Sequence, residues 1–167
     1  DTLNNLRLVF DEMGTVTAGT ASPLTDGASA TLICNEEYAK KNNLEILAKI
    51  VSTAVNGCPP ELMGLGPISA TKKALKRANL TIKDMDIIEL NEAFASQSLA
   101  CMKDLKMDPN IVNIDGGAIA LGHPLGATGS RITAKAAQLL KREKKKYALS
   151  TQCIGLGQGI ATILKSY

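Results

Sequence analysis

The sequence contains few aromatic residues and few side chains that bind metals. Its 167 residues include no tryptophan, one histidine and only 3% aromatic residues. Sites that stack nucleotide bases or sugars need several rings, so we do not expect such sites. Four widely spaced cysteines, Cys34, Cys58, Cys101 and Cys153, form no C-x-x-C pair. We therefore expect no metal site and no disulfide framework, but reduced thiols in a cytosol-like compartment.

Long apolar runs and a strong net charge are also absent. No hydrophobic segment approaches the length of a membrane span, and residues 1–5 lack the basic and apolar regions of a secretion signal. The formal charge of +3 is too small to indicate nucleic-acid binding. The dense basic stretch at residues 141–146 falls at a predicted helix end, where cations favour the helix dipole. We expect no membrane span, no secretion and no nucleic-acid partner.

Patterns typical of strands and helices alternate along the chain. The size of 17.6 kDa suits one domain spanning residues 1–167. Hydrophobic period and turn residues predict strands over 28–33, 47–55, 86–90, 111–114, 147–151 and 160–164. They predict helices over 36–41, 67–78, 92–106 and 124–142. This order indicates an α/β fold with a mixed, mostly buried sheet and helices on its faces.

Three segments that follow predicted strands carry residues suited to catalysis. Asn91 follows one strand, His123 lies in the glycine-rich stretch 116–129, and Cys153 begins the stretch 153–159. Loops at the ends of neighbouring strands meet at one edge of a sheet, so these residues are expected to converge. A histidine near a helix N-terminus has a lowered pKa, and its neutral ring accepts a thiol proton or donates to an oxyanion. We predict that Cys153 lies in a turn whose backbone N–H groups stabilise a thiolate or an adjacent anion, and that Asn91 holds a water or carbonyl oxygen.

Each of these residues also has a purely structural interpretation. A histidine before a proline often serves as a loop hydrogen-bond donor, and a buried cysteine often packs as a small hydrophobe. A Rossmann-like nucleotide site is a further alternative, because Gly122 to Gly126 leads into a helix, but the G-x-G-x-x-G spacing is missing. A redox function needs a second thiol near Cys153, and no cysteine occurs within a short loop of it.

Five motifs resemble signatures of the thiolase family, in the same order along the chain. The longest runs Gly116-Gly117-Ala118-Ile119-Ala120-Leu121-Gly122-His123-Pro124. The others are Asn91-Glu92-Ala93-Phe94-Ala95, Cys153-Ile154-Gly155, Gly14-Thr15-Val16-Thr17-Ala18-Gly19 and Met63-Gly64-x-Gly66-Pro67. The resemblance covers essentially the whole chain, which is similar to the C-terminal domain of an acetyl-CoA acetyltransferase or 3-ketoacyl-CoA thiolase.

The resemblance implies a thiolase-like layered fold and a two-step acyl transfer between coenzyme A thioesters, without a metal or redox cofactor. Coenzyme A is then a substrate, and a cysteine in an N-terminal half carries the acyl group. By the same resemblance, His123 activates that nucleophile and contributes to an oxyanion hole. Cys153 moves the proton on the acetyl α-carbon or on coenzyme A, and Asn91 positions a water of the oxyanion hole. Backbone N–H groups near Gly155 stabilise the second oxyanion.

The resemblance also implies a set of residues that contact the substrate. Ser22, Ala21 and Leu24 match a loop that contacts the pantetheine arm. Met63, Ala93 and Phe94 match residues that line the acyl end, although Met63 and Phe94 suit simple core packing equally well. We treat Cys34, Cys58 and Cys101 as packing residues.

Leu156, Thr20 and Pro23 depart from the commonest family pattern. Leu156 followed by Gly157-Gln158-Gly159 resembles bacterial 3-ketoacyl-CoA thiolases of fatty-acid β-oxidation more than acetoacetyl-CoA thiolases. We therefore favour the former. A biosynthetic acetoacetyl-CoA thiolase half and a non-catalytic acyl-CoA binding module remain alternatives.

The sequence has no counterpart of the family's nucleophile, and it begins at Asp1. We expect a piece of a longer protein whose partner is an N-terminal thiolase half, with no thiolase turnover by itself. The complete protein is expected to form a homodimer or homotetramer in the cytoplasm or an organelle matrix.

Overall fold

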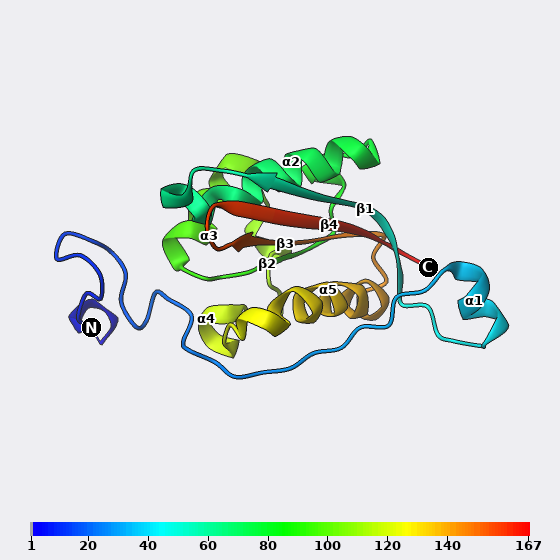
Figure 1. Cartoon of the computed structure of the whole chain (residues 1–167), viewed down its shortest axis with the longest axis horizontal. Helices are drawn as coiled ribbons and strands as arrows, with labels where there is room; N and C mark the ends of the chain where they lie inside the picture. Colours follow the sequence, from blue (N-terminus) through cyan, green and yellow to red (C-terminus); the bar gives the residue numbers. More distant parts are fainter. Residues whose placement is uncertain (1) are drawn as a thin grey trace.

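A mixed four-stranded sheet lies between two layers of helices in the computed structural model, which describes residues 2–167 (Figure 1). The strand order is β1-β4-β3-β2, with β2 and β3 parallel and the other neighbours antiparallel. The strands are β1 (Ala48–Gly57), β2 (Ile87–Leu90), β3 (Tyr147–Ile154) and β4 (Gln158–Ser166). The helices are α1 (Glu36–Lys41), α2 (Gly66–Ala78), α3 (Ala95–Leu105), α4 (Ala118–Leu121) and α5 (Leu125–Arg142). Short 3-10 helices are η1 (Leu3–Asn5), η2 (Pro60–Leu65), η3 (Ile82–Asp84) and η4 (Pro109–Ile111). The predicted α/β fold is confirmed.

Each face of the sheet has its own aliphatic core. Helices α2 and α3 cover one face, and α4 and α5 lie on the other (Figure 1). On the α2 side, Ala70 and Ala74 are fully buried, because alanines bring the helix close to the sheet. On the α5 side, Leu139 and Leu140 pack against Ile87 of β2. The sequence pattern fits this arrangement, since both helices place apolar residues at helical spacing on the buried side.

Residues 22–35, before α1, form an extended segment that runs along α5 (Figure 1). Two side-chain hydrogen bonds attach it to α5: Ser29 Oγ donates to the carbonyl of Ala127 at 2.7 Å, and the hydroxyls of Thr31 and Ser130 are 2.6 Å apart. The strand predicted over 28–33 is wrong, because this part of the chain pairs with no strand of the sheet. Its neighbour is a helix, whose backbone groups are already hydrogen-bonded, so the β-prone side chains have no ladder to join.

Two further predictions need correction. The strand predicted over 111–114 is reduced to a single bridge between Ile88 and Val112, since Pro109 starts η4 and Asn113 has a left-handed φ of 48°. The helix predicted from residue 92 begins at Ala95, because Phe94 is extended and forms a bridge with Ala21. The remaining predicted strands and helices are present, with ends shifted by a few residues.

Candidate active site

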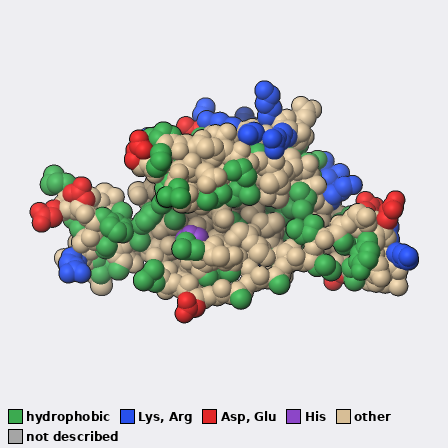
Figure 2. All heavy atoms as spheres, in the orientation of Figure 1, with side chains coloured by type: hydrophobic (Ala, Val, Ile, Leu, Met, Phe, Trp, Pro, Cys, Tyr) green, Lys and Arg blue, Asp and Glu red, His purple; other side chains and the backbone are tan. Residues whose placement is uncertain are grey.

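A cavity of about 820 Å³ opens where the end of β3, the start of α5 and the N-terminal segment meet. The single histidine of the chain is visible on this face, bordered by apolar side chains (Figure 2). All the predicted site residues except Asn91 line this cavity: His123, Cys153, Gly155, Ala21, Ser22, Leu24, Met63, Ala93 and Phe94. The predicted convergence of the segments carrying His123 and Cys153 is therefore confirmed.

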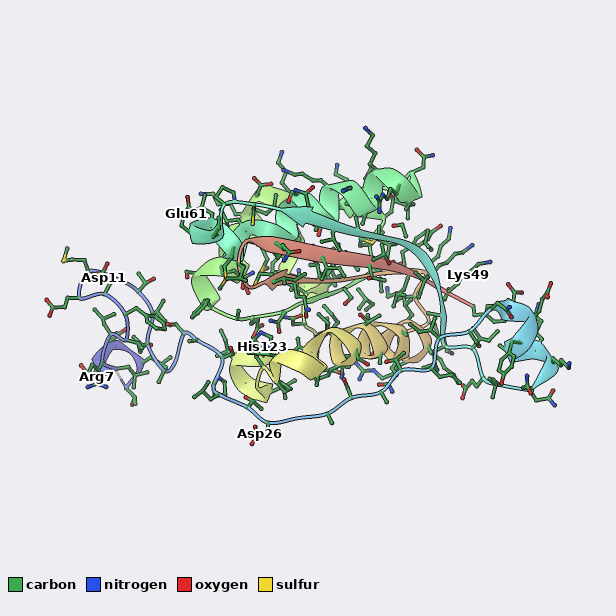
Figure 3. The ribbon with its side chains drawn as sticks, viewed as in Figure 1. Arg7, Asp11, Asp26, Lys49, Glu61 and His123 are labelled. Carbon is green, nitrogen blue, oxygen red and sulfur yellow. The ribbon has the colours of Figure 1, made fainter. Side chains whose placement is uncertain are left out.

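His123 lies between α4 and α5, at the edge of the sheet (Figure 3). Its ring is held from both sides, with Nδ1 2.6 Å from Thr128 Oγ1 and Nε2 3.2 Å from Asn91 Nδ2. Its backbone N–H donates to Thr25 Oγ1 at 3.2 Å. The preceding Gly122 has a φ of 97°, and a Cβ there would be 2.6 Å from Thr25. The turn into His123 thus requires glycine.

The hydrogen bonds favour one tautomer of the imidazole. The Thr128 hydroxyl is 3.0 Å from the carbonyl of Pro124 and donates its only proton there. The Thr128 oxygen then accepts from Nδ1–H, and the lone pair on Nε2 of His123 accepts from the Asn91 amide. Burial, followed by the positive charge of Arg131, lowers the pKa of His123 below its ordinary value. The predicted lowering of the His123 pKa is confirmed, and its main cause is burial rather than the helix N-terminus.

Asn91 is almost completely buried at the end of β2, with 1% of its surface exposed. Its backbone N–H donates to Thr151 at 3.0 Å, which continues the parallel pairing of β2 with β3. Its Nδ2 contacts His123, whereas its Oδ1 accepts no hydrogen bond from any residue between 2 and 167. A buried acceptor of this kind normally has a partner, such as water or a ligand.

Cys153 lies within strand β3, opposite Gly159 of β4, and not in the predicted turn. The hairpin ladder continues to Ile154, so the turn covers only residues 155–157. Burial, and then the neighbouring thiol of Cys58, raise the pKa of Cys153. The prediction of a stabilised thiolate is therefore wrong: the buried side chain favours the neutral thiol. Near neutral pH the cavity holds a neutral base and a protonated thiol.

Two adjacent segments form the apolar wall of the cavity. Ala21 forms a β-bridge with Phe94, and Ser22 donates to the carbonyl of Ala93 through both its N–H, at 3.0 Å, and its hydroxyl, at 3.2 Å. Leu24 follows with its side chain fully exposed. This pairing brings the residues expected to contact the pantetheine arm next to those expected to line the acyl end, although the two groups are far apart in the sequence.

Some lining or supporting residues are not apparent from the sequence pattern. Phe10 packs edge-to-face on Phe94 at 6.4 Å, and Gln152 lies beside Cys153 on the cavity wall. Thr128 orients His123 from one turn into α5. A hydroxyl five residues after a candidate catalytic histidine, on a predicted helix, is the one available signal for Thr128.

A buried carboxyl shares an electrostatic neighbour, Arg131, with the histidine. Glu89, on β2 and 3% exposed, has its pKa raised to about 7 by burial, against the opposing charges of Lys135 and Arg131. Arg131 also lowers the pKa of His123, so it acts on both groups.

The other cysteines differ in their environment. Cys101 is buried in α3, as its packing assignment predicts, and Cys58 is half-buried. Cys34 is exposed, so its assignment to packing is wrong. In residues 2–167, no group of three or more His, Cys, Asp or Glu side chains is arranged to hold a metal ion. Within the same residues, no helix combines the length and apolar character needed to cross a membrane.

Comparison with protein families gives two matches. Residues 44–166 match the family model described as "Thiolase, C-terminal domain", and residues 1–37 match "Thiolase, N-terminal domain". The boundary falls close to α1. That residues 1–167 form a single domain stays a prediction.

The chain is also similar to named proteins and to solved structures. The chain is 58% identical over 167 residues to a 3-ketoacyl-CoA thiolase of Vibrio cholerae, covering 98% of this chain and 43% of that protein. It matches the crystal structure of human mitochondrial 3-ketoacyl-CoA thiolase in complex with CoA at 50% identity and a TM-score of 0.92, covering 99% of this chain and 42% of that one. It matches the Bacillus anthracis acetyl-CoA acetyltransferase at 40% identity and a TM-score of 0.96, with the same coverage. The chain thus spans less than half the length of these relatives.

Proposed function

The chain belongs to the thiolase family, and from that premise we propose that it forms the acid–base half of an enzyme that transfers acyl groups between 3-ketoacyl-CoA, acetyl-CoA and coenzyme A. Coenzyme A compounds are the substrates in this proposal, and the crystal structure of the human relative in complex with CoA supports that choice. The names of the relatives favour 3-ketoacyl-CoA over acetoacetyl-CoA specificity. The likeness to an acetyl-CoA acetyltransferase keeps the latter as an alternative.

The observation that carries this proposal is that the His123 imidazole and the Cys153 thiol line one cavity, where burial favours the neutral form of each. In our proposal, the cysteine that carries the acyl group comes from an N-terminal half of the complete protein. The Nε2 lone pair of His123 takes the proton of that cysteine, and the resulting thiolate attacks the 3-keto carbon of the substrate.

The second proton carrier is Cys153. When the bond between the α-carbon and the keto carbon breaks, its electron pair stays on the α-carbon, and the Cys153 thiol protonates it to give acetyl-CoA. Coenzyme A then returns a proton to the Cys153 thiolate and attacks the enzyme-bound acyl group. The nucleophilic cysteine leaves as a thiolate, regains its proton from His123, and the acyl-CoA is released. A raised thiol pKa suits this role, because it makes the thiolate a stronger base.

Two further groups stabilise negative charge in this proposal. The unpaired Oδ1 of Asn91 holds a water that donates to the thioester oxygen of the enolate. His123 donates to the same oxygen through the Nε2–H that it gained from the cysteine. Backbone N–H groups near Gly155, which also lines the cavity, serve the oxyanion formed during the attack by coenzyme A.

The proposal is tested in the protein that joins this chain to its N-terminal half. Cys153→Ala is expected to reduce condensation of acetyl-CoA, and exchange of its methyl protons with D2O, by roughly 100-fold to 10,000-fold. Acyl transfer to the enzyme should keep much of its rate, because that step uses His123. Cys34→Ala is the matched control, since Cys34 is exposed and does not line the cavity. Equal loss of both half-reactions in Cys153→Ala contradicts the assignment.

A second measurement uses the 167-residue chain itself. We expect no thiolysis of acetoacetyl-CoA by the pure polypeptide, and turnover by it would disprove the need for a nucleophile from another segment. A homodimeric or homotetrameric assembly stays a prediction from the family resemblance. A cytoplasmic or matrix location is proposed because the human relative is mitochondrial and all four cysteines are free thiols.

A further inference from the structure

Two consecutive side chains at the end of β2 point to different parts of the histidine segment. Asn91 contacts the imidazole itself. The next residue, Glu92, makes two hydrogen bonds to the loop that precedes His123. Glu92 does not line the cavity and has no role in the proposed reaction.

The Glu92 carboxylate bonds to the loop through both oxygens. Oε2 accepts from the backbone N–H of Ile119 at 3.1 Å, and Oε1 accepts from Asn113 Nδ2 at 2.8 Å. Ile119 is in the first turn of α4, whose N-cap residue, Gly117, has no side chain to cap it. Glu92 therefore supplies the capping carboxylate from another element.

Asn113 connects this carboxylate to the end of β2. Its Nδ2 also donates to the Leu90 carbonyl at 2.8 Å, its Oδ1 accepts from the Leu90 N–H at 2.9 Å, and its own N–H donates to Ile88 at 2.8 Å. Together with the bond to Glu92, these contacts fix Asn113 to the end of β2 through its side chain and its backbone. Because β2 also leads into Asn91, the same strand end sets both the loop and the partner of the imidazole.

Gly117 leaves the space that the Glu92 carboxylate occupies. A Cβ at this position would lie 2.0 to 2.3 Å from the carboxylate atoms of Glu92. Gly117 has φ −116° and ψ −170°, which any residue can adopt. Glycine is needed here for space rather than for conformation, and the space is filled by Glu92.

We propose that Glu92 is a positioning residue that, with Asn113, holds the α4 loop against the end of β2 and so fixes His123 toward Asn91. The inference rests on the proposed function for the importance of His123. Its test reads the position of the ring and the loop, and needs no turnover.

The test uses Glu92→Gln in the 167-residue chain, whose single histidine gives an unambiguous NMR signal. The glutamine amide group must face a donor, either the Ile119 N–H or the Asn113 amide, so one of the two bonds is lost. In either orientation the Ile119 N–H loses its charged acceptor and faces a neutral amide oxygen or an NH2 group, so we expect the Ile119 amide to exchange with D2O roughly tenfold faster. We expect the pKa of His123 to rise toward its ordinary value of 6.5, because a loosened ring is less buried.

The direction of the pKa change separates positioning from simple charge. Removing a nearby negative charge without movement lowers a histidine pKa. A fall, or no change, in the His123 pKa therefore overturns the proposal. Glu37→Gln, on the exposed helix α1, is the matched control and is expected to change neither readout.

Gly117→Ala provides an independent variant that keeps the charge. Its methyl group must displace the Glu92 carboxylate, so it is expected to give the same two changes as Glu92→Gln. Gly57→Ala, where the nearest atom to an added Cβ is 4.0 Å away and which does not line the cavity, is its control. If Glu92→Gln does not fold, Gly117→Ala decides by the same readouts. Unchanged Ile119 exchange and His123 pKa in Gly117→Ala contradict the inference even if the acyl-transfer function holds.

Discussion

The two proton-carrying residues of the cavity are held in different ways. His123 lies in a loop between two helices, and side chains fix it: Thr128 and Asn91 on the ring, Thr25 on the backbone. Cys153 lies in β3, and the backbone ladder to Gly159 fixes it.

This difference determines what substitutions can do. On the histidine side, a change of one side chain alters the position or pKa of the ring and leaves the sheet intact. On the cysteine side, the position depends on the hairpin of β3 and β4, which also belongs to the core of the fold. Adjusting the site therefore requires side-chain changes near His123, whereas changes in the backbone near Cys153 affect the stability of the whole protein.

The largest expected effect on stability is that of Gly159→Ala, at the position paired with Cys153 in the hairpin. An added Cβ would lie 2.1 Å from the backbone C and O of Gly66 and 2.7 Å from the N of Pro67, at the start of α2. Backbone atoms cannot move aside as a side chain does, so we expect a loss of about 3 kcal/mol in the free energy of unfolding. Urea denaturation measures this loss.

Gly155→Ala, in the adjoining turn, is the matched control and is expected to change stability by less than about 0.5 kcal/mol. A loss below about 1 kcal/mol in Gly159→Ala would mean that the hairpin shifts away from α2 at little cost, so that the backbone around Cys153 is not rigid.

A smaller effect is expected on the histidine side, for Thr128→Val. Valine keeps the shape and removes the hydroxyl between His123 Nδ1 and the Pro124 carbonyl, at a cost of about 1 to 2 kcal/mol. Since that hydroxyl accepts from Nδ1–H, its loss removes a bond that stabilises the charged ring, and the His123 pKa should fall further. NMR titration of the single histidine measures the change.

Thr133→Val serves as the control, because Thr133 is on the same helix and bonds Ser150 rather than the ring. Its His123 pKa should equal that of the unsubstituted chain. A rise in the pKa in Thr128→Val would show that the hydroxyl donates to Nδ1 and that the opposite tautomer is present.

The sequence correctly predicts those elements whose hydrophobic pattern agrees with the residues that mark their ends. Pro67 and the alanine spacing give α2, and the apolar run before Asn91 gives β2. The strands predicted over 28–33 and 111–114 fail for a physical reason: β-propensity is local, but a strand exists only where another edge is free to pair. One segment lies against a helix, and the other is turned away by the left-handed Asn113.

In the candidate site, too, some features follow from the sequence pattern and others depend on tertiary contacts. The glycine density around His123 and its position before a predicted helix are sufficient to place it in a candidate site, although the strand predicted over 111–114 is only a bridge. The prediction at Cys153 fails because the glycines that follow it indicate a turn, whereas pairing with β4 continues the strand through Ile154. The roles of Thr128 and Glu92 depend on side-chain directions, which a sequence pattern does not contain.

The smallest expected effect concerns Cys153 and the other thiols, and it needs no substitution in the cavity. Only the thiolate reacts with iodoacetamide, so a raised pKa lowers the rate at a given pH. At about pH 8 we expect exposed Cys34 to react fastest, Cys153 more slowly, and Cys101, with its pKa raised to about 11 by burial, slowest. Between about pH 7 and 9 the rate at Cys153 should keep rising, because this range lies below its raised pKa. Mass spectrometry of the labelled peptides measures each rate, and unfolding in urea should make the rates alike. Labelling of Cys153 as fast as that of Cys34 in the folded chain would show that the hairpin does not keep this thiol neutral.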